Sequence, residues 1–244
     1  MLFDSPFSII SWLSFLCYLS NISRVCVNGL YPMVELNKDN TLILKNVINE
    51  QSTSDLIHKI NLMRNKSNIY IYLDTPGGEV ENGMKIIDEV KKYNISCIAE
   101  RAYSMGFAIF QSCSVRYIVP HGKLMQHQIS YGHSTELGKM NSYIHYINNI
   151  HTELVKQQSR RMRLPTRKFE MNIQNEWWIF GSSTIEENAA DEMIHAYCTQ
   201  SLTNQVYNIT RNGYIYTYSS CPLVTKELEK TRDKSSSNDM FFFL

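Results

Sequence analysis

An almost continuous apolar run, NIYIYL from Asn68 to Leu73, ends directly at the turn sequence Asp74-Thr75-Pro76-Gly77-Gly78. A strand without polar alternation is typical of a strand buried on both faces of a parallel sheet. Apolar residues then recur at helical steps of three or four, at Val80, Met84, Ile87 and Val90. A buried strand, a glycine turn and an amphipathic helix together predict one βα unit of an α/β fold.

The same pattern repeats on both sides of this unit. Strands are predicted at 41–47, 96–99, 115–119 and 123–127, and helices at 54–63, 104–112, 134–162 and 184–191. Alternating strands and helices predict a parallel sheet with crossover helices. The helix from Ser134 to Met162 is closed by Pro165 and has several polar faces, so we expect it to project from the domain or to form an interface.

Composition sets limits on the class of protein. The chain has 244 residues, 43% of them apolar and 19% charged, which fits one large domain with extensions and excludes wholesale disorder. A net charge of +1 gives no electrostatic argument for a nucleic-acid partner. The six cysteines include no C-x-x-C pair and are too sparse for a disulfide scaffold, which favours a reducing compartment and no metal site.

Both ends differ from the centre. The segment from Phe7 to Leu19 is apolar, but it is shorter than the ~20 residues that span a bilayer and has no Lys or Arg before it. It is interpreted as a docked amphipathic or core helix, as a signal or membrane-surface segment that would give weak membrane association, or as a disordered segment. Lys226 to Asp239 is charged and polar, so we expect a mobile tail. The predicted organisation is an N-terminal extension (1–40), a central domain (41–199) and a partly disordered C-terminal extension (200–244).

Three short motifs can carry chemistry. Gly77-Gly78 follows a buried strand, where a free backbone N–H can stabilise an oxyanion, although the motif also suits a plain turn. Ser104 lies at a strand-to-helix junction and is either a helix cap or a cleft-facing hydroxyl. His127 ends a strand and is a structural histidine or a general base. His121 and His133 are competing histidines.

Order and spacing connect the three motifs. SMG begins 26 residues after Gly78, and the histidine of MxHQ lies 23 residues after Ser104. From about Thr41 to Ala196 the chain resembles the proteolytic subunit of the Clp protease. The resemblance implies an α/β fold of the Clp/crotonase type, with a repeated βαβ core and a long projecting handle helix at Ser134–Met162.

The resemblance also implies roles for individual residues. Ser104 is then the nucleophile, His127 its general base, and the N–H groups of Gly78 and Met105 the oxyanion hole. The family's third residue is Asp, whereas the matching position here is Glu176, with Asn175 a weaker candidate. Asn188 replaces a family glycine and can adopt the same left-handed conformation. No cofactor or metal is implied.

The implied activity is hydrolysis of unfolded polypeptides by a serine endopeptidase inside a homo-oligomeric ring. The resemblance also implies an AAA+ ATPase unfoldase as the partner. This chain has no Walker motif with which to hydrolyse ATP itself. Three alternatives stay open. They are a signal-peptide-peptidase type with Lys139 or Lys156 as base, a ring subunit that has lost activity and serves as a scaffold, and a crotonase-type acyl-CoA enzyme. Cleavage specificity is not predicted, although Tyr103 beside Ser104 is expected to narrow the cleft.

Overall fold

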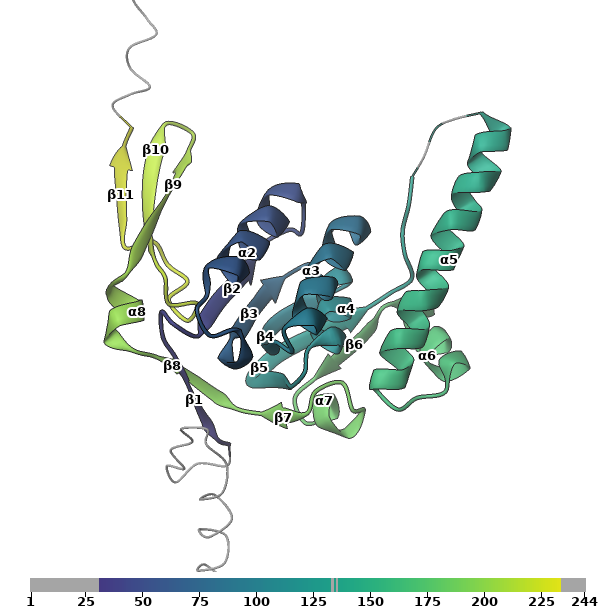
Figure 1. Cartoon of the computed structure of the whole chain (residues 1–244), viewed down its shortest axis with the longest axis horizontal. Coiled ribbons are helices and arrows are strands. Elements are labelled where there is room, and N and C mark those ends of the chain that lie inside the picture. The colour runs from purple at the N-terminus through teal and green to yellow at the C-terminus, as the bar shows by residue number, and fades with distance from the viewer. Residues whose placement is uncertain (1–30, 133, 135, 234–244) are drawn as a thin grey trace, which may run out of the picture.

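The computed structural model describes residues 31–132, 134 and 136–233, which form a central sheet with helices against it (Figure 1). The elements are, in chain order, β1 (Met33–Leu36), β2 (Thr41–Lys45), α2 (Glu50–Leu62), η2 (Lys66–Asn68), β3 (Tyr70–Thr75), α3 (Val80–Lys92), β4 (Ser96–Tyr103), α4 (Met105–Ser112), β5 (Arg116–Gln126), α5 (Leu137–Arg161), α6 (Thr166–Asn172), η3 (Ile173–Asn175), β6 (Trp177–Phe180), α7 (Ser183–Glu186), β7 (Glu192–Met193), β8 (His195–Cys198), α8 (Gln200–Asn204), β9 (Val206–Arg211), β10 (Tyr214–Ser219) and β11 (Glu229–Arg232).

The main sheet has the order β2-β3-β4-β5-β6, and β7 pairs with β5. Strands β2 to β5 are parallel, whereas β6 runs antiparallel to β5. The predicted α/β class with a parallel sheet and crossover helices is therefore confirmed. The two strands predicted at 115–119 and 123–127 are one strand, β5. Pro120 is tolerated inside it because the pairing with β4 shifts register there.

The sheet is covered on both faces, which explains the apolar runs of its strands. Helices α2, α3 and α4 lie on one face (Figure 1), and their buried side chains join those of the strands in the larger core cluster. On the other face, Tyr70, Tyr72 and Tyr117 pack with Ile194 of the segment between β7 and β8 and with Leu202 of α8. The parallel pair of β1 and β8 lies at this second cluster.

Several helix ends differ from the prediction for local reasons. Helix α2 begins at Glu50 instead of Ser54, because Asn49 and Ser52 form a reciprocal capping box. Helix α7 has four residues instead of the eight predicted. Its N-cap is Ser182, and the hydroxyl of Ser183 donates to the Phe180 carbonyl at 2.6 Å. Asn188 has a φ of 52°, so the left-handed conformation predicted for it is confirmed.

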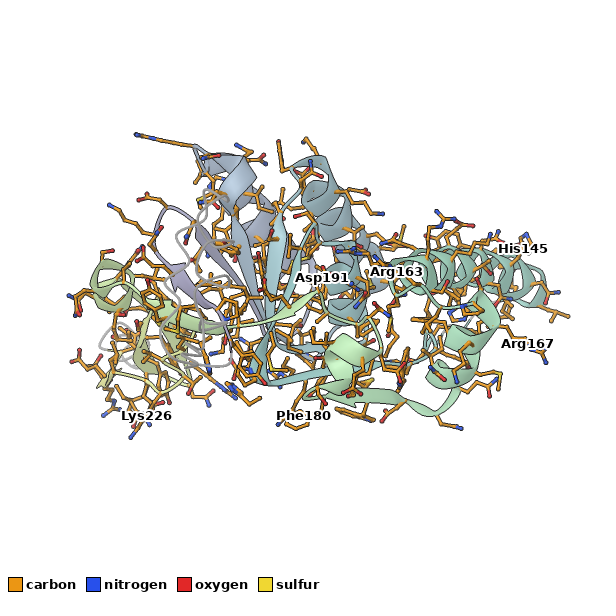
Figure 2. The ribbon with its side chains drawn as sticks, turned by 90° about the horizontal axis from the view of Figure 1, so that it is seen from below. His145, Arg163, Arg167, Phe180, Asp191 and Lys226 are labelled. Carbon is orange, nitrogen blue, oxygen red and sulfur yellow. A yellow bond between two sulfur atoms is a disulfide. The ribbon has the colours of Figure 1, made fainter. Side chains whose placement is uncertain are left out.

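The C-terminal part contains structure that the sequence pattern did not predict. Strands β9, β10 and β11 form an antiparallel sheet, and β11 lies inside the segment expected to be a mobile tail. In Figure 2, Lys226 on this side and His145 of α5 lie at opposite ends of the molecule. The apolar segment 7–19 lies outside the described residues. None of the helices in the described part is both long and apolar enough to cross a membrane.

Two disulfides join cysteines that the spacing argument left unpaired. Cys97 of β4 is bonded to Cys113 after α4, and Cys198 of β8 is bonded to Cys221 after β10. The paired cysteines are 16 and 23 residues apart, and these spacings match no cysteine motif. The pairs could therefore be recognised only once the fold had brought the partners together. Disulfides are typical of oxidising surroundings, so the low cysteine count is no guide to the compartment.

Candidate active site

Three neighbouring parallel strands end at the same edge of the sheet, and each is followed by one of the predicted motifs. Gly77 and Gly78 follow β3, Ser104 follows β4, and His127 follows β5. The carboxyl ends of strands are where α/β folds bind ligands. Gly78, Ser104, Met105 and His127 all line one cleft, which is closed on the other side by α5 and Ile173.

Ser104 adopts a strained backbone conformation, with φ 53° and ψ −117°, between β4 and α4. Its N–H donates to the Met125 carbonyl at 2.9 Å, and its own carbonyl accepts from Phe107 at 3.0 Å. A non-glycine residue at positive φ persists only where its surroundings hold it there. A sharp strand-to-helix turn of this kind presents a serine hydroxyl to a cleft, as in a nucleophile elbow.

Gly77 packs directly beneath this turn. A Cβ on Gly77 would lie 2.6 Å from the Tyr103 carbonyl oxygen and 2.8 Å from Ser104 Cβ, and its φ of 92° also favours glycine. Glycine is therefore required here for close approach, which is a stronger role than that of a plain turn.

The two backbone N–H groups expected to form an oxyanion hole have no hydrogen-bond partner among the described residues. Ile48 is hydrogen-bonded to both neighbours of Gly78. Its N–H donates to the Gly77 carbonyl at 2.8 Å, and its carbonyl accepts from the Glu79 N–H at 2.9 Å. The Gly78 N–H is thereby left out of the ladder. The Met105 N–H is free because it begins α4.

His127 is oriented by its own loop. Its Nδ1 lies 2.5 Å from the Gln128 carbonyl oxygen, and its backbone N–H donates to Gln126 Oε1 at 3.0 Å. A carbonyl can only accept, so this contact assigns the ring proton to Nδ1 and leaves Nε2 as the acceptor. That tautomer is the one that a base next to a serine hydroxyl requires.

Sequence reasoning missed the residues that support His127. The buried Gln126 and Gln158 side chains are hydrogen-bonded to each other, and Gln158 Nε2 also donates to the Leu154 carbonyl at 2.9 Å. This chain ties the end of β5 to helix α5. His151 of α5 also lines the cleft. Gln126 occupies the variable position of MxHQ and Gln158 belongs to no motif, so neither was singled out from the sequence. His151 is one of many polar residues of a long helix and carried no signal either.

Glu176 does not line the cleft. It follows η3 with a φ of 56°, and its Oε2 accepts a hydrogen bond from the Trp178 indole N–H at 3.2 Å. Ser104, His127, Gly78 and Met105 are thus brought together, whereas the candidate third residue bonds to an exposed tryptophan two positions away.

The competing residues lie elsewhere. His121 Nε2 is 3.6 Å from Glu100, and His133 lies outside the described residues. Lys139 and Lys156 pair with Glu136 and Glu153 on their own helix turns and do not line the cleft.

Tyr103 does not line the cleft either. Its ring packs edge-on against Trp178, with 5.0 Å between ring centroids, so the expected narrowing by Tyr103 is wrong for this cleft. No group of three His, Cys, Asp or Glu side chains in the described ranges is arranged to hold a metal ion.

The chain is similar to proteins of a known family. The model of the Clp protease family matches residues 29–196. The chain belongs to the Clp protease family. Proteins named ATP-dependent Clp protease proteolytic subunit from Streptococcus salivarius and Streptococcus thermophilus are 24% identical over 169 residues, and the match covers 65% of this chain and 86% of theirs. The protein of that name from Streptococcus sanguinis is 23% identical over the same length.

The family match contains all the candidate site residues and stops at 196, before α8 and the sheet of β9, β10 and β11. The resemblance inferred from the sequence motifs is therefore confirmed, and family membership supports a protease. The C-terminal sheet is the part of this Clp protease family member that the family model does not cover.

Proposed function

We propose that this chain is a serine endopeptidase like the Clp proteolytic subunit, which hydrolyses peptide bonds of unfolded polypeptides. The observation that carries the proposal is the convergence of Ser104, His127, Gly78 and Met105 on one cleft. A Ser hydroxyl is a weak nucleophile at neutral pH, and the neighbouring imidazole supplies the base that activates it.

In the proposed reaction, Ser104 Oγ attacks the scissile carbonyl carbon and its proton passes to His127 Nε2. The negative charge that develops on the carbonyl oxygen is stabilised by the free N–H groups of Gly78 and Met105. His127 then donates the proton to the leaving amine. Water hydrolyses the acyl-enzyme by the same steps in reverse order.

Glu176 is proposed as the carboxylate that stabilises the imidazolium form of His127. To do so its carboxylate must leave Trp178 and approach the imidazole ring beside the Gln128 carbonyl, which continues to accept from Nδ1. Such a rearrangement fits assembly into a ring, with α5 as the handle helix between rings and an AAA+ ATPase as the partner that feeds substrate. Both partners are inferred from the family alone.

The test is hydrolysis of a fluorogenic peptide by the full chain. Ser104→Ala and His127→Ala are each expected to abolish cleavage, whereas Lys139→Ala and Lys156→Ala are expected to retain it. Loss of activity in a lysine variant with retention in His127→Ala would replace the proposal by a Ser-Lys mechanism. A folded oligomer that never cleaves would favour an inactive scaffold subunit, an alternative supported by the position of Glu176 outside the cleft.

A further inference from the structure

A second and larger hollow lies between the edge of the main sheet and the C-terminal sheet, on the side where Figure 1 shows β2 and α2 facing β9. We call it the β2 groove. Its volume is about 540 Å³, within the ~300–1,000 Å³ range of ligand pockets. All six residues from Thr41 to Asn46 line one side, with Leu56 and Lys59 of α2. Tyr207 and Ile209 of β9 line the other.

The β2 side of the groove is a free strand edge. Tyr70 N–H donates to the Asn40 carbonyl at 2.7 Å, and Asn46 N–H donates to the Asp74 carbonyl at 3.1 Å. Alternate residues of a parallel strand direct their backbone groups to the same neighbour, so the even-numbered residues of β2 bond to β3. Ile43 and Lys45 direct theirs to the opposite side, where they have no backbone partner in the described part of the chain.

The β9 side of the groove has exposed aromatic and apolar side chains that are held in place by their neighbours in the C-terminal sheet. Tyr207 is 41% exposed and Ile209 43%. Tyr207 stacks on Tyr218, with 5.8 Å between ring centroids, and Ile209 pairs across the ladder with Tyr216. Cross-strand neighbours of this kind hold the two side chains in place for a ligand.

The groove is also basic. Its lining includes Lys38, Lys45 and Lys59 but one acidic residue, Asp55. Lys45 pairs with Asp74 at 3.8 Å, so Lys38 and Lys59 leave an excess of one positive charge over Asp55. An anionic ligand is therefore favoured. A nucleic acid can use the lysines and Tyr207, but it does not pair with a strand edge. An extended polypeptide uses all three features.

From these observations we propose that the β2 groove binds an extended segment of a partner protein, rich in acidic and apolar residues, that adds to the sheet beside β2. The segment's backbone hydrogen-bonds with Ile43 and Lys45, its apolar side chains contact Tyr207 and Ile209, and its carboxylates face the lysines. The proposal concerns binding alone and does not depend on peptidase activity.

The test measures fluorescence anisotropy of a labelled ten-residue peptide of alternating Glu and Val, titrated with the full chain. We expect saturable binding, and slower hydrogen exchange at the amides of Ile43 and Lys45 but not at those of Leu42 and Leu44, which already face β3. The same peptide with N-methyl groups at alternate residues, and a peptide of alternating Lys and Val, are each expected to bind at least about tenfold more weakly.

Two variants form a matched pair. Tyr207→Ala is expected to weaken binding by about tenfold. Tyr214→Ala, at a similarly exposed tyrosine (38%) of the same sheet that does not line the groove, is expected to leave it unchanged. Hydrogen exchange of the C-terminal sheet in both variants shows whether the sheet remains folded.

Four results would overturn the proposal. The first is equal binding of the N-methylated peptide, and the second is preference for a single-stranded oligonucleotide over the acidic peptide. The third is slow hydrogen exchange at the amides of Ile43 and Lys45 in the absence of peptide, if this slow exchange is lost when residues 234–244 are removed. That result would make this chain's own segment the occupant. The fourth is a change of oligomeric state in Tyr207→Ala, which would make a second copy the occupant.

Discussion

Replacing Glu176 by Gln tests how the base is oriented. In a serine protease triad the carboxylate fixes the tautomer of the histidine and stabilises its charged form, and its replacement by an amide costs about 10⁴ in kcat. Here the Gln128 carbonyl already accepts from Nδ1 at 2.5 Å, so the tautomer does not depend on Glu176. Only the stabilisation of the imidazolium is left for the carboxylate to supply.

The size of that contribution can be worked out. A hydrogen bond to a charged group contributes about 1–2 kcal/mol more than one between neutral groups. At 1.36 kcal/mol for each factor of ten, Glu176→Gln should lower kcat/KM for a fluorogenic peptide by about 5- to 30-fold. The Michaelis constant should change little, because the carboxylate acts on the transition state. Glu170→Gln, an exposed glutamate on α6, is the matched control and should have no effect.

Either extreme would refute this reasoning. A loss near 10⁴ would mean that Glu176 also holds the tautomer, so that the Gln128 contact is absent from the active enzyme. Unchanged activity would mean that Glu176 stays with Trp178 and has no part in catalysis.

Three further predictions concern the framework of the site and the C-terminal sheet. Gly78→Ala should lower the free energy of unfolding by more than about 2 kcal/mol in chemical denaturation, because a Cβ there would lie 2.2 Å from a backbone oxygen at a φ of 151°; an unchanged midpoint would contradict the geometry. Burial alone would raise the pKa of the Asp191 carboxyl, but its hydrogen bonds with Arg116 and that residue's charge lower it. The stability from this pair is therefore present above the ordinary carboxyl pKa near 4 and lost as the pH falls through the lowered value. Asp191→Asn should cost about 2 kcal/mol at pH 7, measured in urea, and the difference from wild type should shrink below pH 4; a constant difference would show that the carboxyl charge does not matter. Replacing Cys198 and Cys221 together by Ala should destabilise the C-terminal sheet by about 3 kcal/mol, from a separation of 23 residues. The loss of stability should appear as faster hydrogen exchange in β9 and β10 of the variant, and adding a reductant to the variant should not speed exchange in these strands further. Identical exchange in the variant and in oxidised wild type would contradict the prediction.

The sequence predicted the central fold well, because each parallel strand and its helix had a local signal. The run at Asn68–Leu73 and the glycine turn after it fall where β3 and its turn lie. Motif order also placed Ser104, His127 and Gly78 at one edge of the sheet.

Other features had no local signal. Of the C-terminal strands only β10 (YIYTYS) has tyrosine at alternate positions, whereas β9 and β11 are exposed along their whole length, so no apolar pattern marked them as strands. The chain of Gln126 and Gln158 joins residues 32 positions apart, which only the packing of α5 against β5 brings together. Glu176 was assigned by resemblance alone, and its carboxylate accepts a hydrogen bond from the indole N–H of Trp178 instead of lining the cleft.

The most direct test of the central claim is covalent labelling of the purified full chain with a fluorophosphonate probe, read by intact mass and peptide mapping. The account predicts a single adduct on Ser104, lost in Ser104→Ala and strongly slowed in His127→Ala. No adduct on a folded oligomer, or an adduct on another serine, would contradict an activated Ser104 and with it the proposed peptidase.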